Sequence, residues 1–195
     1  DAHAYGEAGP GQQTPGWWND FIGPGRPIDT DRFFVVCANV LGGCQGTTGP
    51  ASINPVTGRR WGGDFPVVTI RDVVRSQRAL AQHLGIQRWM AVVGGSMGGM
   101  QALEWATSYP DRCGSLVIIA STAAASAQQI AWSQVGRQAI LDDPAYEGGH
   151  YYDAAPGEGP HLGLANARRI AMIHYRSDEE FDRRFDRHSN DAIEP

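Results

Sequence analysis

The stretch Trp89-Met90-Ala91-Val92-Val93-Gly94-Gly95-Ser96-Met97-Gly98-Gly99 decides the fold of this chain. Its first part, residues 89–93, is apolar and predicts a buried strand, and residues 98–107 predict a helix. Between them the sequence matches the pattern G-x-S-x-G, which places a serine on a sharp turn from strand to helix. Glycines permit such a turn, because larger side chains would clash with the neighbouring chain. The turn lifts the Ser96 hydroxyl to the N-terminus of the helix, where free N–H groups favour developing negative charge.

Ser96 has two interpretations: a serine that only caps the helix, or the nucleophile of an acyl transfer. The strand before the motif and the amphipathic helix after it favour the nucleophile. An acyl-transfer serine also needs two N–H donors aimed at the oxyanion. We expect one donor at Met97, the residue after the nucleophile, and the other in the glycine-rich loop 39–50, where Leu41 is the candidate. A plain Gly/Thr turn is the other interpretation of that loop.

Further strands and helices are predicted on both sides of this motif. Strands at 33–37, 89–93 and 116–119 alternate with helices at 70–84 and 98–107, a pattern typical of a parallel α/β sheet covered by helices on both faces. A capping box, Thr69 with Asp72, predicts where the first helix begins, and Gly85 predicts where it stops.

The two ends of the chain have a different character. Residues 1–31 are rich in glycine and proline and are predicted to form a long loop. After Ala120 no strand is predicted, and helices are expected at about 126–141 and 162–175. We therefore predict a partial α/β core over 1–121 and part of a helical insertion over 122–195.

Composition excludes several classes of protein. Lys and Arg number 16 against 21 Asp and Glu, and the net charge of -5 argues against binding to nucleic acid. No stretch approaches the roughly 18 apolar residues that cross a bilayer, and no signal peptide is visible at the start. The 3 cysteines lack C-x-x-C spacing, so we expect neither disulfides nor a metal site, and a cytoplasmic location.

Two long stretches closely resemble the homoserine O-acetyltransferase family, whose members have the α/β-hydrolase fold. They are Asn39-Val40-Leu41-Gly42-Gly43-Cys44-Gln45-Gly46-Thr47-Thr48-Gly49-Pro50 and Gly94-Gly95-Ser96-Met97-Gly98-Gly99-Met100-Gln101-Ala102-Leu103-Glu104-Trp105. Shorter matches are Arg32-Phe33-Phe34-Val35, Phe65-Pro66, Gln138-Ala139-Ile140 and Tyr175-Arg176-Ser177. The resemblance implies an incomplete α/β-hydrolase fold with the start of a helical lid over 122–195.

In that family an acetyl group passes from acetyl-CoA to the serine and then to the γ-hydroxyl of L-homoserine, in methionine biosynthesis. The resemblance implies that Ser96 is the nucleophile and that the Leu41 and Met97 amides form the oxyanion hole. Acetyl-CoA would be a co-substrate, with no tightly bound cofactor. We also expect a homodimer formed through the lid helices.

The resemblance further implies that Arg168 binds the homoserine carboxylate and that Tyr175 lines the same pocket. The two residues lie seven apart in a predicted helix and so share one face, which favours Arg168 over Arg169. Taken alone, the pair is more typical of an ordinary surface arginine and a packing tyrosine.

A serine nucleophile needs a general base, which in this fold is a histidine oriented by an acid. The histidines after Ser96 are His150, His161, His174 and His188, and none follows a strand as a triad histidine should. The family's Asp and His are expected beyond residue 195. The chain is therefore predicted to be an internal piece of a longer enzyme, poorly folded and inactive by itself.

Several alternatives stay open. The donor could be succinyl-CoA or the acceptor L-serine, since Arg168 suits either amino acid. Water could replace the acceptor, which would make the protein a hydrolase, or the piece could be an inactive fragment. A basic group could meet the coenzyme A phosphates or form a solvated surface; it comprises Arg59, Arg60, Arg71 and Arg75.

Overall fold

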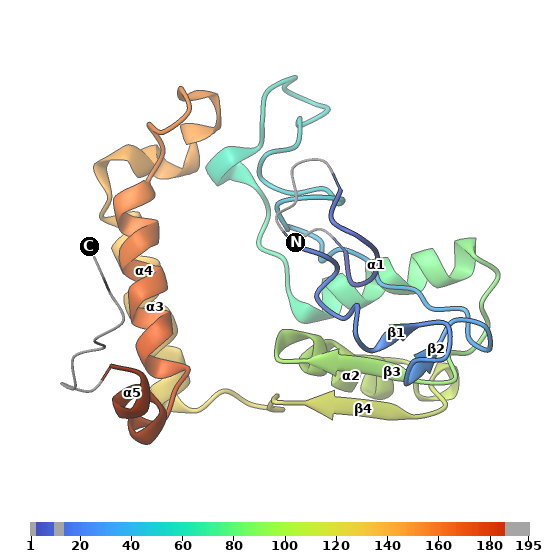
Figure 1. The fold of residues 1–195 in the computed structure, drawn as a ribbon. Coiled ribbons are helices and arrows are strands. Elements are labelled where there is room, and N and C mark those ends of the chain that lie inside the picture. Colours follow the sequence, from blue (N-terminus) through green and yellow to red (C-terminus); the bar gives the residue numbers. More distant parts are fainter. Residues whose placement is uncertain (1–2, 10–13, 186–195) are drawn as a thin grey trace. The chain divides into compact units, whose positions relative to one another are not determined.

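The computed structural model describes residues 3–9 and 14–185. The chain divides into two compact units, Asp1–Ala123 and Ala124–Pro195 (Figure 1). The first unit contains all the described strands, and the second contains only helices. The absence of strands after Ala120 agrees with the sequence pattern over the described residues, whereas the role of the second unit as a lid stays a prediction.

A pair of parallel strands with one connecting helix forms the centre of the first unit. Strand β3 (Val92–Gly95) pairs with β4 (Leu116–Ile119) over their whole length. Helix α2 (Met97–Ser108) and the 3-10 turn η2 (Pro110–Arg112) connect them, and α2 packs against both strands. Strand β4 and helix α2 are confirmed where the sequence predicts them. The strand predicted at 89–93 begins as one isolated bridge from Trp89, and its regular part lies later, at 92–95.

Helix α1 (Ile70–His83) begins and ends at the residues that local chemistry predicts. The capping box is present: the Asp72 N–H donates to the Thr69 hydroxyl at 3.2 Å, and the Thr69 N–H donates to the Asp72 carboxylate at 3.0 Å. The hydrogen bonds with Thr69 hold the pKa of Asp72 below its usual value. Gly85 stops the helix with φ of 73°, a conformation that costs glycine nothing.

The core of the first unit lies between α1 and α2. Val74 and Ala81 of α1 pack with Trp105 of α2, and partly buried residues of the following loop and strand surround them. Two glutamines join the helices inside this core. The Trp105 indole N–H donates to Gln77 at 2.8 Å, and the Gln77 amide donates to the buried Gln101 at 2.6 Å. Because these buried polar groups are paired, they fix the position of α2 without leaving an unsatisfied group.

The first predicted strand is wrong. Residues 33–37 have no regular structure, and Phe34 is 74% exposed. A strand exists only where a neighbour accepts and donates its backbone hydrogen bonds, and no described segment pairs with 33–37. The predicted N-terminal loop instead contains two short paired strands, β1 (Ile22–Gly23) and β2 (Ile28–Asp29). A 3-10 turn, η1 (Gly62–Asp64), precedes α1.

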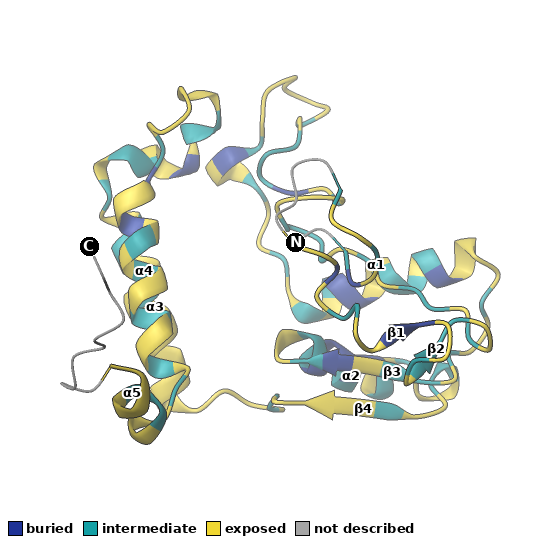
Figure 2. Cartoon of the chain, viewed as in Figure 1, coloured by how far each residue is buried: buried dark blue, intermediate teal, exposed yellow. Residues whose placement is uncertain are grey.

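Helices do not cover both faces of the sheet within the described residues. Helix α2 packs on β3 and β4, and α1 packs on α2. Val117, Ile118 and Ile119 of β4 remain 40–47% exposed, and most of this strand is coloured as exposed in Figure 2. Apolar residues of a parallel strand are normally buried on both sides. The predicted cover is therefore only partly present among the described residues.

The second unit is a pair of packed helices with short turns between them. Helices α3 (Ala127–Leu141) and α4 (His161–His174) lie within one residue of their predicted bounds. They are joined through η3 (Pro144–Gly149) and η4 (Tyr151–Asp153) and contact each other closely. A further helix, α5 (Asp178–Phe185), was not predicted.

One carboxylate ties the end of α3 to the start of α4. The Gly163 N–H donates to Asp143 at 2.7 Å, and this bond is the main cause that holds the pKa of Asp143 below its usual value. The close approach requires glycine, because a Cβ at Gly163 would lie 2.8 Å from the Ile140 Cα.

Among the described residues, no helix is both long and apolar enough to cross a membrane.

We expect residues 1–195 expressed alone to unfold without a cooperative thermal transition and to show no turnover. A few hundred Å² of apolar surface on β4 and the helices stays uncovered. At about 25 cal/mol per Å², this lowers the free energy of unfolding by several kcal/mol. That loss rivals the whole stability of an ordinary domain. Circular dichroism during heating, with an assay of acetyl-CoA and homoserine, measures both properties. A sharp transition together with turnover would contradict the prediction.

Candidate active site

Ser96 stands at the turn between β3 and α2 with a strained backbone. Its φ and ψ are 54° and −121°, and positive φ is rare for a residue with a side chain. Its side chain makes no capping hydrogen bond, although Ser96 holds the N-cap position. The alternative in which this serine only caps the helix therefore does not fit the structure. Such strain costs about 1–3 kcal/mol and persists only where surrounding contacts hold it.

The end of β4 holds this strained turn. The Ser96 N–H donates to the Ile119 carbonyl at 2.9 Å, continuing the parallel pairing one residue beyond β3. The Ser96 carbonyl accepts from the Gly99 N–H at 3.0 Å and from the Ser121 hydroxyl at 2.7 Å. Sequence reasoning did not single out Ser121. Its position two residues after the predicted strand 116–119 is the signal that could have pointed to it.

The four glycines around Ser96 are not equivalent. A Cβ at Gly94 would overlap the Gly98 carbonyl, and a Cβ at Gly99 would lie 2.5 Å from the Ser121 Cβ. By contrast, a Cβ at Gly95 would be no closer than 3.8 Å to its neighbours, and at Gly98 it would meet open space. The tight turn therefore depends on Gly94 and Gly99, where the backbone of α2 and the end of β4 approach most closely.

The two expected oxyanion donors are Met97 and Leu41. Neither N–H donates to an acceptor within the described part of the chain, so both are available to a ligand. Met97 is the first residue of α2, where helix N–H groups have no partner in the helix. In the loop that holds Leu41, the Gly42 N–H donates to Thr48 and the Gly43 N–H to Val40, both at 2.8 Å. No hydrogen bond within residues 3–9 and 14–185 joins this loop to the turn at Ser96, so a shared oxyanion hole stays a prediction.

Arg168 and Tyr175 lie in the second unit, on α4 and at its C-cap. The helix is continuous, and Tyr175 keeps a helical backbone, so their seven-residue spacing places them on one face. Both are exposed, Tyr175 to 75%. Arg168 has no hydrogen bond or ion pair within the described residues, whereas Arg169 donates to Asn166 at 2.8 Å. Since Ser96 belongs to the first unit, a pocket shared by Ser96, Arg168 and Tyr175 stays a prediction.

No hydrogen bond joins His150, His161 or His174 to the Ser96 hydroxyl. His174 stacks on Trp132, with ring centroids 5.6 Å apart, so it packs within the second unit. His150 and His161 are exposed, and His188 lies outside the described residues. The general base that Ser96 requires is therefore not found among the histidines that the structure describes.

The basic group considered for the coenzyme A phosphates is largely occupied. Arg71 bonds to Glu104 at 2.9 Å, and Arg75 bonds to Asp72 at 3.3 Å. Arg60 donates to the Ala51 carbonyl at 2.7 Å. These exposed pairs favour the interpretation as a solvated surface over a phosphate site.

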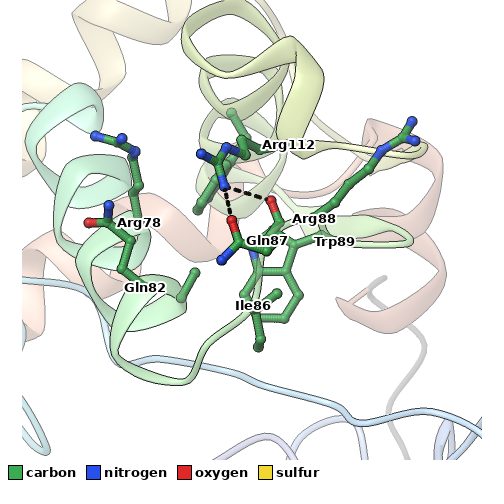
Figure 3. Close-up of a pocket in the computed structure, with 9 residues that line it drawn as sticks. Arg78, Gln82, Ile86, Gln87, Arg88, Trp89 and Arg112 are labelled. Atoms are coloured by element: carbon green, nitrogen blue, oxygen red, sulfur yellow. Dashed lines mark hydrogen bonds between the residues drawn. The ribbon is translucent and has the colours of Figure 1, made fainter.

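A small cleft at the opposite end of β3 does not suit acyl transfer. It lies at Trp89, at the start of the β3 segment, whereas Ser96 follows its end. Figure 3 shows the lining side chains, among which Arg112 donates to the Gln87 carbonyl and side chain at 2.9 Å. Its volume of about 10 Å³ holds at most one water molecule. A cleft of this size has no room for an acyl group.

Neither Cys37 nor Cys113 has the lowered pKa of an activated nucleophile, because burial raises the pKa of both thiols. Cys37, Cys44 and Cys113 are all free. Arg88 opposes the effect of burial on the pKa of the Cys113 thiol. Within the part of the chain that the structure describes, no group of His, Cys, Asp and Glu residues could hold a metal ion.

Comparison with known proteins establishes the class of fold. A sequence model of the alpha/beta hydrolase fold family matches residues 9–193, and the chain belongs to that family, as predicted. It is similar to the homoserine O-acetyltransferase of Clavibacter michiganensis subsp. michiganensis, with 58% identity over 195 residues, 100% of this chain and 50% of that protein. A homoserine O-succinyltransferase of Halorhodospira halophila is 54% identical over 185 residues, 95% of this chain and 48% of that protein.

Solved structures give the same fold. The homoserine O-acetyltransferase from Bacillus anthracis matches with a TM-score of 0.86 and 35% identity, over 96% of this chain and 51% of that one. The esterase E22 matches with a TM-score of 0.82 and 37% identity, over 93% and 50% of the two chains. The chain thus spans about half the length of the relatives it matches.

We expect Gly94→Ala and Gly99→Ala to destabilise the full gene product by about 1–3 kcal/mol, the usual cost of forcing atoms into a packed site. Gly98→Ala is the matched control, because its Cβ meets open space in α2 and alanine favours a helix by up to about 1 kcal/mol. Urea unfolding of the three variants measures the differences. Equal stability of Gly94→Ala and Gly98→Ala would contradict the assignment of the tight contact.

Proposed function

We propose that the protein containing this chain is a homoserine O-acetyltransferase that carries an acetyl group on Ser96. The strained Ser96 at the N-terminus of α2 is the observation that carries the proposal. Relatives named homoserine O-acetyltransferase, at 51–58% identity, support the choice of acceptor and donor. Methionine biosynthesis in the cytoplasm is the proposed setting.

The first half of the reaction acylates the serine. The Ser96 oxygen attacks the thioester carbon of acetyl-CoA, and its proton passes to a general base. The negative charge that develops on the thioester oxygen is stabilised by the Met97 N–H, joined by the Leu41 N–H. The carbon–sulfur bond then breaks, and the coenzyme A thiolate leaves with the proton held by the base. We propose that this base is a histidine paired with an aspartate beyond residue 195.

The second half transfers the acetyl group to the acceptor. The γ-hydroxyl of homoserine gives its proton to the base and attacks the acetyl carbon, and the Ser96 oxygen leaves and regains a proton. Both halves use the same oxyanion donors because both pass through a tetrahedral intermediate. Transfer also requires that water be kept from the acyl-enzyme. We propose that the helices of the second unit serve this purpose as a lid.

Recognition of the acceptor falls to α4. Arg168 is exposed and has no partner among the described residues, so its guanidinium can pair with a carboxylate in a bidentate manner. Tyr175 lies on the same helix face and completes the proposed pocket. This recognition suits homoserine and serine alike.

Two alternatives rest on particular relatives. The relative named as a succinyltransferase favours succinyl-CoA as a second candidate donor. The likeness to esterase E22 favours a hydrolase, in which water replaces the acceptor hydroxyl. Product analysis with each acyl-CoA, with homoserine, serine or no acceptor, distinguishes them. If free acetate is released without an acceptor as fast as acetyl-CoA is consumed with homoserine, the protein is an esterase and not a transferase.

We also propose that the protein is a homodimer formed through the lid helices. Several large apolar side chains of α3 and α4 are 37–56% exposed, among them Ile130, Trp132, Val135 and Met172. Apolar helix surface of this kind is normally covered by another part of the protein or by a partner.

The nucleophile assignment predicts a covalent intermediate. The full gene product incubated with acetyl-CoA alone should gain one acetyl group, and Ser96→Ala should not. Mass spectrometry of the intact protein measures the adduct, and steady-state kinetics should give the parallel double-reciprocal lines of a ping-pong mechanism. Ser115→Ala, a serine at the opposite end of β4, is the control. An adduct that persists in Ser96→Ala would disprove the assignment.

The acceptor assignment predicts a separation of the two half-reactions. Arg168→Leu should weaken homoserine use by about 2–5 kcal/mol, the cost of removing one partner of a charge pair that bound homoserine buries, and leave acetylation of Ser96 intact. Arg169→Leu is the matched control, because Arg169 is already bonded to Asn166. Kinetics with homoserine and the rate of Ser96 acetylation measure the two steps. Equal loss of both steps in Arg168→Leu would give this residue a structural role instead.

A further inference from the structure

We infer that Ser121 is a positioning residue that aims the Met97 N–H at the oxyanion; the inference rests on the proposed role of Ser96. The Ser121 hydroxyl donates to the Ser96 carbonyl at 2.7 Å. That carbonyl and the Met97 N–H belong to one peptide group, which is planar and trans, so they point in opposite directions. A side chain that fixes the direction of the carbonyl therefore fixes the direction of the N–H.

The contacts of this carbonyl show why Ser121 matters. Within α2 the Ser96 carbonyl accepts from Gly99 at 3.0 Å and from Met100 at 3.3 Å. The helical bonds orient the peptide group relative to α2 alone. The bond from Ser121 comes from the segment after β4 and so orients the peptide group relative to the sheet.

A second strained residue places Ser121. Ala120 has φ of 47°, a left-handed conformation that residues with a side chain rarely adopt. The register pairs Gly95 with Ile119, so the two strained residues, Ser96 and Ala120, follow the last paired positions of adjacent strands. The turn at Ala120 ends the strand and leads into Ser121, whose Cβ packs against Gly99. Strain at two neighbouring positions beside one candidate active site is the pattern expected when geometry serves the chemistry.

The chain contains a matched control for this hydrogen bond. Ser115, just before β4, donates its hydroxyl to the Met90 carbonyl at 3.0 Å. Ser121, just after β4, donates its hydroxyl in the same way to the Ser96 carbonyl, at the other end of β3. Both bonds join a serine hydroxyl to a backbone carbonyl across the β3–β4 pair, and only the second involves the peptide of the proposed oxyanion donor. Ser115→Ala and Ser121→Ala thus remove equivalent bonds with different expected consequences.

The experiment measures acylation of Ser96 in the full gene product with p-nitrophenyl acetate as the probe, because this ester reports on the serine whichever acceptor is natural. Ser121→Ala should lower the acylation rate constant by about 10- to 100-fold, up to the loss seen when one oxyanion donor is removed. The dissociation constant for the ester, obtained from the dependence of the acylation rate on ester concentration, should stay unchanged, since the donor acts on the transition state. Ser115→Ala should leave both constants unchanged. The thermal midpoints of the two variants should be similar.

Two further variants keep the inference falsifiable. Ser121→Cys preserves the size of the side chain and replaces the hydroxyl with a weak donor, so it should fold and lose nearly as much rate as Ser121→Ala. Ser121→Thr keeps the hydroxyl and should recover most of the rate. Equal rates in Ser121→Ala, Ser121→Cys and Ser115→Ala, with Ser96 still acylated, would overturn the positioning role alone. Acylation that survives in Ser96→Ala would overturn the proposed nucleophile and this inference together.

Discussion

The first unit depends on the parallel pairing of β3 with β4 and its continuation one residue further, where the Ser96 N–H donates to Ile119. A serine with φ of 54° is unfavourable by itself, and the hydrogen bonds from the end of β4 are what make it persist. The requirement for Gly94 and Gly99 follows from this pairing. The turn must bring α2 against the strand and against Ser121 at distances that leave no space for a Cβ. The strain at Ser96, the need for the two glycines and the strand register therefore all follow from the pairing of β3 with β4.

Helix α2 transmits this constraint to the rest of the first unit. Its N-terminus holds the turn at Ser96, while its middle is fixed to α1 by Trp105 and Gln101 through Gln77. The capping box and the terminal glycine set the length of α1, and α1 in turn supplies Val74 and Ala81 to the core.

Elements with a local cause could be predicted from the sequence, and those that depend on distant partners could not. Helix α1, helix α2 and the turn at Ser96 follow from caps, periodicity and the glycine pattern, which act within a few residues. The apolar run 33–37 has the composition of a strand, but a strand needs a hydrogen-bonded neighbour, and sequence alone does not show whether one is present. Ser121 escaped notice for the same reason, because its importance lies in a contact with a residue 25 positions away. Arg168 and Tyr175 were proposed from a family resemblance and a shared helix face, and their joint role with Ser96 requires an arrangement of two units that local patterns do not fix.

The two units are proposed to contribute different kinds of groups to the reaction. In the first unit the proposed oxyanion donors are backbone N–H groups, which no substitution of Leu41 or Met97 short of proline removes. Other substitutions in the first unit can only change the direction in which these N–H groups point. For this reason a positioning contact, such as the one proposed for Ser121, is important. In the second unit the proposed contacts are side chains, which substitution changes directly. Acetyltransferases, a succinyltransferase and an esterase are all similar to this chain, and an acyl-serine is chemically competent for each of these reactions. The choice among donors and acceptors must therefore be made by groups other than the serine turn. Arg168 is proposed for the acceptor because its exposed guanidinium, without a partner among the described residues, can pair with a carboxylate.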